Sequence, residues 1–179
     1  VVVIGWQVYD LARETMGIKQ AALQLGLVGL AQFLPLLALT LVTGWVADRL
    51  DRRWIIRVAI GLEVFCALSL AWLTWTNTVT LPALFGVAAL LGVARAFLAP
   101  AQQALAPNLV PTASLPTAIA LSALAWQAGS IDGPAMGGYL YAAAPALPYA
   151  VSGGLFVVSL LMMFLVAPVP GSQVARTGR

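Results

Sequence analysis

The sequence has 179 residues, of which 61% are hydrophobic and 8% charged, and its mean hydropathy is +0.95. Soluble domains carry about 25% charged residues, so this composition excludes a soluble globular domain and indicates a protein whose solvent is lipid. With no histidine and one cysteine, Cys66, the residues also exclude zinc catalysis, Ser-His-Asp or Cys-His nucleophiles and a disulfide framework.

Six charge-poor apolar runs predict six membrane-spanning helices, because a crossing helix needs about 20 apolar residues. The runs are continuous and do not alternate with period two, which favours helices over barrel strands. The first run, "VVVIGWQVYDLAR", is apolar for nine residues before Asp10 and opens without Met, so we interpret it as the second half of a span. The predicted spans are about 1–12, 21–47, 54–75, 79–105, 116–143 and 147–167. Residues 168–179 are predicted to be a cytoplasmic tail or the start of a central linker.

The distribution of arginine predicts the orientation of these spans. Four arginines lie in or beside the loop between spans 2 and 3, and two more follow span 6: Arg49, Arg52, Arg53, Arg57, Arg176 and Arg179. The positive-inside rule therefore places this loop and the tail in the cytoplasm. Four crossings separate them, which agrees with a common side. Arg13 and Lys19 in the opposite loop count against this orientation and are partly offset by Asp10 and Glu14.

The loop between spans 2 and 3, "GWVADRLDRR", concentrates charge, since five of the six residues from Asp48 to Arg53 are charged. One interpretation is a topology signal, but that needs arginine alone, and here acids are interleaved. Asp48 and Arg52 are spaced to pair on a helix. Asp51 precedes span 3, where the helix dipole favours a negative charge, and Gly44 allows another helix to come close. These features suit a latch that is made in one conformational state and broken in another.

The same loop resembles the loop 2-3 signature of the major facilitator superfamily, Gly-x-x-x-Asp-Arg/Lys-x-Gly-Arg-Arg/Lys. The matching residues are Gly44, Asp48, Arg49, Arg52 and Arg53. Asp51 departs from the signature, because it stands where glycine is usual. With aspartate at this position, the loop resembles that of the superfamily branch that includes bacterial siderophore and macrolide exporters.

A second stretch, "AGSIDGPAMGG" in span 5, resembles the Gly-x-x-x-Gly-Pro-x-x-Gly-Gly motif of superfamily antiporters. The matching residues are Gly129, Gly133, Pro134, Gly137 and Gly138. The glycines spaced by four line one helix face and permit close packing, and Pro134 is expected to kink the span. An ordinary packing face of small residues is the alternative. "GVARAF" and "LVPTASLPTAIAL" also look like span 4 and the 4-5 loop of the exporter branch.

The resemblance implies an all-α integral membrane protein, the N-terminal six-helix bundle of a twelve-helix transporter with its first span incomplete. It implies proton-coupled efflux, by antiport, of an amphipathic small molecule across the bacterial cytoplasmic membrane. Neither a cofactor nor an enzymatic activity is expected, and the partners are the substrate, the bilayer and the C-terminal six-span half. No nucleic-acid partner is expected, because the basic residues are clustered at a few points and are not spread along an element as a basic face would require. The alternatives are an integral membrane enzyme of lipid headgroup transfer, for which Asp48 and Asp51 have one suitable spacing, or an inactive half-transporter or scaffold.

Ionisable residues inside the spans indicate function, because burying charge in lipid is unfavourable. Glu63 lies near the midplane and is a candidate proton carrier, since a carboxyl group in apolar surroundings favours its neutral form. Arg95 matches the span 4 arginine that the resemblance links to proton transfer or to the latch, with a structural arginine that reaches the interface as the alternative. Asp132 and Asp10 are expected near the outer mouth. Further cavity candidates are Gln7, Gln32, Trp126 and Gln127.

Overall fold

The computed structural model describes residues 2–109 and 111–165, apart from the side chains at 41, 47, 48, 104, 106–109 and 112. Within these residues the fold is all-helical, as predicted. The elements are α1 (Val2–Thr15), α2 (Ile18–Arg49), α3 (Arg52–Trp75), α4 (Leu81–Leu109), a short 3₁₀ turn (Thr112–Ser114), α5 (Leu115–Ala143) and α6 (Leu147–Leu165). The predicted tail at 168–179 lies outside the described residues.

Four of the described helices are long and apolar enough to cross a membrane, namely α2, α3, α4 and α6. The helix α5 has ample length, but glutamine, serine, aspartate, proline and several glycines in its middle lower its hydropathy. The helix α2 begins three residues before the expected limit, at Ile18, because a charged residue such as Lys19 can sit on the first turn of a helix while its head reaches polar surroundings.

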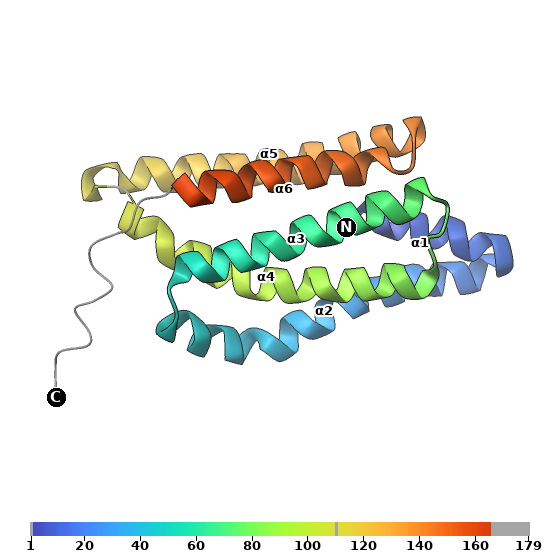
Figure 1. Ribbon diagram of the computed structural model, residues 1–179, viewed down its shortest axis with the longest axis horizontal. Helices are drawn as coiled ribbons and strands as arrows, with labels where there is room; N and C mark the ends of the chain where they lie inside the picture. Colours follow the sequence, from blue (N-terminus) through green and yellow to red (C-terminus); the bar gives the residue numbers. More distant parts are fainter. Residues whose placement is uncertain (1, 110, 166–179) are drawn as a thin grey trace.

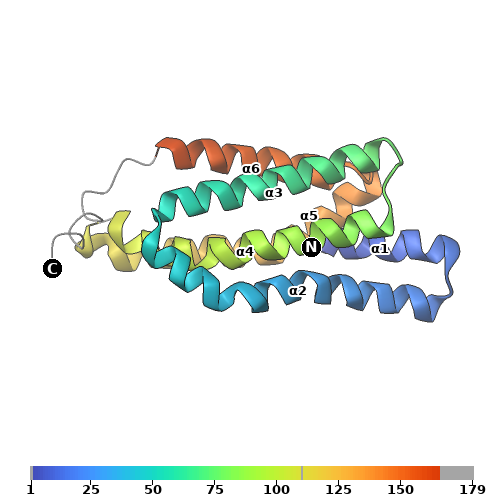
Figure 2. The ribbon, with the colours of Figure 1, turned by 60° about the horizontal axis from the view of Figure 1, so that its bottom comes forward.

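The helices form an elongated bundle with α4 at its centre (Figures 1 and 2). The helix α4 packs against α2 on one side and α3 on the other, and α6 lies along α3. The α2–α3 turn and the end of α6 share one end of the bundle, while the α3–α4 and α5–α6 connections lie at the other. The even number of crossings predicted between these two points is compatible with this arrangement.

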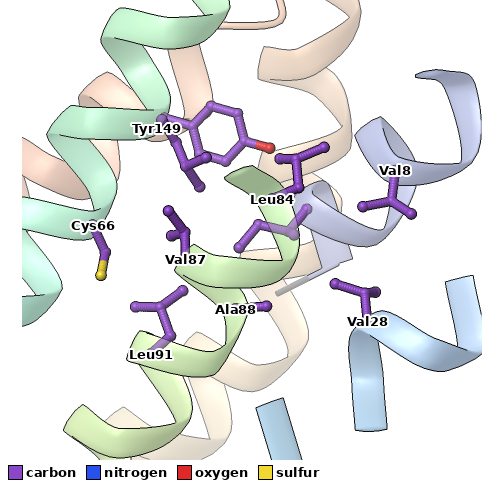
Figure 3. Packing of buried hydrophobic residues seen from close by; sticks show 10 residues of the cluster. Val8, Val28, Cys66, Leu84, Val87, Ala88, Leu91 and Tyr149 are labelled. Carbon is purple, nitrogen blue, oxygen red and sulfur yellow. The ribbon is translucent and has the colours of Figure 1, made fainter. Parts of the chain in front are cut away.

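The core is apolar and is built around α4. Leu84, Val87, Ala88 and Leu91 of α4 point toward residues of α1, α2, α3 and α6 (Figure 3). Cys66 is completely buried in this cluster and is a free thiol, as expected of a small core residue. A second cluster joins α3, α4 and α6 near the α2–α3 turn, and includes Ile56 and Met163.

The turn between α3 and α4 explains the predicted break at "TNT". Asn77 has a φ of 54°, in the left-handed region that asparagine tolerates better than most residues. The Thr76 hydroxyl donates to the Trp72 carbonyl at 2.9 Å and so satisfies one of the last acceptors of α3. The helix therefore ends at Trp75.

The helices α2 and α4 meet most closely at Gly92. A Cβ atom at this position would overlap the backbone carbonyl of Gln32. The absence of a side chain at Gly92 thus allows the two helices to pack closely. The same contact places Gln32 of α2 beside Gly92 of α4.

Candidate functional site

A cavity of about 550 Å³ lies beside α1 and α2. Its walls are largely apolar, and its polar groups are the ends of a few side chains. The lining residues are Val2, Ile4, Gly5, Trp6, Tyr9, Asp10, Leu25, Val28, Gly29, Gln32 and Ala88. Two of the predicted cavity residues, Asp10 and Gln32, are therefore brought together here. A pocket of this size and lining suits a small molecule with apolar and polar parts.

The carboxylate of Asp10 is held by α5. The Tyr141 hydroxyl donates to Asp10 Oδ2 at 3.2 Å, and the Tyr141 ring lies 6.3 Å from the Trp6 ring, centroid to centroid. One turn earlier on α5, Gly137 faces Val3 of α1, where an added Cβ would come within 3.0 Å of Val3 Cγ2. These contacts place the rim of the cavity at the junction of α1 and α5.

The side chain of Gln32 supplies a second polar group. Its Nε2 atom is buried and has no hydrogen-bond partner among the described residues. Buried donors without a partner are uncommon in folded proteins, and Gln32 lies in the cavity wall. This amide is therefore suited to binding a ligand acceptor or a water molecule.

Gln7, which the sequence suggested as a cavity group, lies instead in the core. Its exposed fraction is 5%, and it is not among the lining residues. The Tyr149 hydroxyl donates to Gln7 Oε1 at 2.6 Å, and Gln7 Nε2 donates to Thr74 Oγ1 at 3.0 Å. The Gln7 side chain points away from the cavity because this buried chain of hydrogen bonds joins α1 to α3 and α6.

The acid Glu63 is buried in α3, with an exposed fraction of 5%. It does not line the cavity. The nearby charge that acts on it belongs to Arg95 of α4, which is itself exposed. The sequence analysis treated Glu63 and Arg95 as separate candidates and did not predict that they are neighbours.

The candidate cavity and charge residues of α5, Trp126, Gln127 and Asp132, are exposed and do not line the cavity. None of the residues of α5 is buried, and Trp126 has an exposed fraction of 79%. Gln127 and Asp132 are likewise exposed, and an added Cβ at Gly129 or Gly133 would meet nothing within 4 Å. The Asp10 side chain contacts Tyr141. Asp132 is about 13 Å away from Tyr141 along the axis of α5, so the two aspartates are not at the same depth.

The α2–α3 turn is short because Asp51 caps α3. Its Oδ1 atom accepts a hydrogen bond from the Arg53 backbone N–H at 3.0 Å, which satisfies a free donor and places a negative charge at the helix N-terminus. The predicted pairing of Asp48 with Arg52 lies outside the described residues, because the Asp48 side chain is not described. Around Gly44 an added Cβ would meet nothing within 4 Å, so this face is open to a partner.

Arginines on either side of the turn contact rings and a carbonyl group. The Arg49 guanidinium lies 4.0 Å from the centroid of the Trp45 ring. Arg57 Nη2 donates to the Met163 carbonyl at 3.3 Å, and its guanidinium lies 4.6 Å from the Phe164 ring centroid. Because Met163 is in the last turn of α6, Arg57 joins the start of α3 to the end of α6.

Replacing Asp51 by alanine is expected to destabilise the protein by about 1 kcal/mol, because the Arg53 N–H loses its cap. The measurement is the melting temperature of the purified full-length protein. Asp51→Asn is the matched control, since asparagine caps a helix equally well. Equal melting temperatures for Asp51→Ala and the wild type would show that the cap contributes nothing.

An all-helical bundle with membrane-length apolar helices has the architecture of an integral membrane protein. The family model described as Major Facilitator Superfamily matches residues 4–179, and the chain belongs to this family. The resemblance predicted from "GWVADRLDRR" is thereby confirmed.

Curated relatives point to the same kind of protein. The chain is 34% identical over 98 residues to "Putative multidrug resistance protein MdtD" of Yersinia pestis (strain Pestoides F) and, equally, to its namesake in Yersinia pseudotuberculosis serotype O:1b (strain IP 31758). The match covers 55% of this chain and 20% of each relative. With these relatives and its apolar helices, the chain is a bacterial membrane protein.

Proposed function

We propose that the chain forms the first six-helix bundle of a secondary active transporter that exports an amphipathic small molecule in exchange for protons. The observation that carries this proposal is the α1–α2 cavity. Aromatic and aliphatic side chains form most of its lining, and Asp10 and Gln32 add a carboxylate and an unpaired amide. Such a surface accepts a molecule with a large apolar part and few polar groups. The names of the curated relatives, which refer to multidrug resistance, support this substrate class.

A second bundle completes the transport path in this proposal. The α5 face that carries Gly129 and Gly133 is exposed and lacks neighbours within 4 Å of an added Cβ, so it is suited to close packing against a further helix. The turn around Gly44 has the same open character. With the α2–α3 turn in the cytoplasm, these surfaces would meet and separate as the two bundles rock in alternating access.

Proton exchange in this proposal uses Glu63. It is a buried acid next to the positive charge of Arg95. A buried carboxylate is stable only with a charge partner, so movement of Arg95 relative to Glu63 would change how readily the acid holds a proton. The exchange of protons for substrate would then depend on the packing of α3 on α4.

The test is transport by the full-length protein in proteoliposomes with an imposed pH gradient and a panel of amphipathic dyes and antibiotics. We expect a dye to move against its gradient and to stop when the pH gradient is collapsed. Glu63→Gln is expected to abolish proton-driven movement while downhill exchange of dye continues. Asp10→Asn is expected to weaken the apparent affinity for dye about tenfold, because a charge-assisted contact contributes about 1.5–3 kcal/mol.

Asp132→Asn is the matched control, because it removes an exposed acid that does not line the cavity. Its transport should equal that of the wild type. If no compound moves and the pH gradient has no effect, the exporter proposal is wrong. If Glu63→Gln transports normally while movement stays proton-driven, another acid carries the proton.

A further inference from the structure

The exposed face of α3 is apolar along its whole length and carries tryptophan near both ends. Its exposed members are Trp54, Val58, Phe65, Leu68, Trp72 and Trp75. At 3.6 residues per turn these positions fall within about 100° of one another around the helix. They therefore form one continuous stripe rather than scattered exposed residues.

The two ends of this stripe are spaced as the two surfaces of a bilayer. At 1.5 Å per residue, Trp54 and Trp75 are about 32 Å apart along the helix axis, and the hydrocarbon core of a bilayer is about 30 Å thick. Tryptophan is enriched where hydrocarbon meets the headgroups. Trp54 thus marks one headgroup level and Trp75 the other.

Of the two ends of the stripe, the end at Trp54 has positively charged residues beside it and the end at Trp75 has none. Arg53 and Arg57 lie on the first two turns of α3 with Trp54, whereas the sequence from 75 to 80 beyond the other end carries no charged residue. Within the part of the chain that the structure describes, Arg57 contacts a backbone carbonyl and an aromatic ring. Both partners are neutral, so neither brings a negative charge to the guanidinium.

The geometry points to a binding site for the phosphate of an anionic phospholipid on the basic end of α3, which we define as Arg53, Trp54 and Arg57. Arg57 follows Trp54 by three residues and Arg53 by four, so its side chain neighbours both on the helix surface. Arg57 has five N–H donors, so it can hold the Met163 carbonyl and a phosphate oxygen together. The acyl chains would then lie along the stripe that begins with Val58.

The combination of the two surfaces identifies the ligand class. A soluble anion or an acidic protein segment could bind the arginines but would leave the adjoining stripe of α3 without an apolar partner. A neutral lipid would cover the stripe but would not compensate the charge. An anion attached to acyl chains matches both, and clustered arginines at a membrane surface attract anionic lipids.

The experiment uses the full-length transporter in nanodiscs that contain phosphatidylcholine with phosphatidylglycerol. Native mass spectrometry counts the lipids of each class that stay bound. We expect the wild type to retain phosphatidylglycerol preferentially, and Arg57→Gln to reduce this preference about fivefold, as expected for one arginine near the surface. Lys19→Gln is the matched control, because Lys19 is exposed at the opposite end of α2 and should leave the preference unchanged.

Two further variants separate binding from folding. Arg57→Lys keeps the charge and should keep most of the preference, and Arg53→Gln should lower it even if Arg57→Gln does not fold. The proposal is overturned if the wild type retains both lipids equally, or if Arg53→Gln and Arg57→Gln leave the preference intact. Loss of both lipid classes alike in Arg57→Gln would also overturn it, since that result assigns Arg57 to the packing of α3 on α6.

Discussion

Replacing Gly92 by alanine is expected to destabilise the protein more than the same change at Gly86, the other glycine of α4. The new Cβ would overlap the Gln32 carbonyl, and a backbone atom cannot turn aside as a side chain can. The helices α2 and α4 must therefore separate along their contact. Overpacking of this kind costs about 1–3 kcal/mol, or roughly 2–4 °C in melting temperature for each kcal/mol.

The matched control is Gly86→Ala, six positions earlier on the same helix, where an added Cβ meets nothing within 4 Å. Both variants place alanine in α4, so helix propensity changes equally in the two. Melting temperatures are measured on purified full-length protein by the loss of monodisperse material on heating. Similar values for the two variants would mean that α2 and α4 are not in contact at Gly92.

Replacing Tyr149 by phenylalanine is expected to destabilise the protein by about 1–3 kcal/mol. The shape of the side chain is retained, but Gln7 Oε1 loses its donor in a site that water does not reach. Tyr139→Phe on α5 is the control, because that tyrosine has an exposed fraction of 79% and should tolerate the change. The same heating assay measures both.

A double-mutant cycle tests whether the buried chain acts as a unit. Gln7→Leu removes the amide that both neighbours use, so Tyr149→Phe should then cost much less than it does in the wild type. Additive effects of the two substitutions would be inconsistent with the hydrogen bond between them.

The all-helical class and the approximate extent of the helices could be predicted from the sequence, because both depend on local composition. Charge-poor runs and the breaks at "RLDRR" and "TNT" mark where helices begin and end, and Asp51 could be placed at the start of α3 by its position alone. The family could also be predicted, since its signature occupies one short turn in which each residue has a local role.

The candidate site was predictable only in part, because it depends on how the helices rotate about their axes. Asp10 and Gln32 line the cavity. Gln7 instead points into the core, where its side-chain amide forms hydrogen bonds with Tyr149 and Thr74. A single sequence does not specify which tyrosine from α5 or α6 reaches which side chain of α1. A tyrosine within an apolar helix could have served as a signal, since its buried hydroxyl group requires a partner.

The contact between Asp10 and Tyr141 also bears on how the protein is made. These partners are 131 residues apart in sequence, and ribosomes add roughly 5–20 residues per second, so about 7–26 seconds separate their synthesis. Until Tyr141 has been synthesised, the Asp10 carboxylate of α1 lacks this hydrogen-bond donor. The helix α5, which carries glutamine, serine and aspartate in its middle, then enters a bilayer in which a hydrogen-bonding partner is already present. Its insertion would thus be assisted by a residue that left the ribosome first.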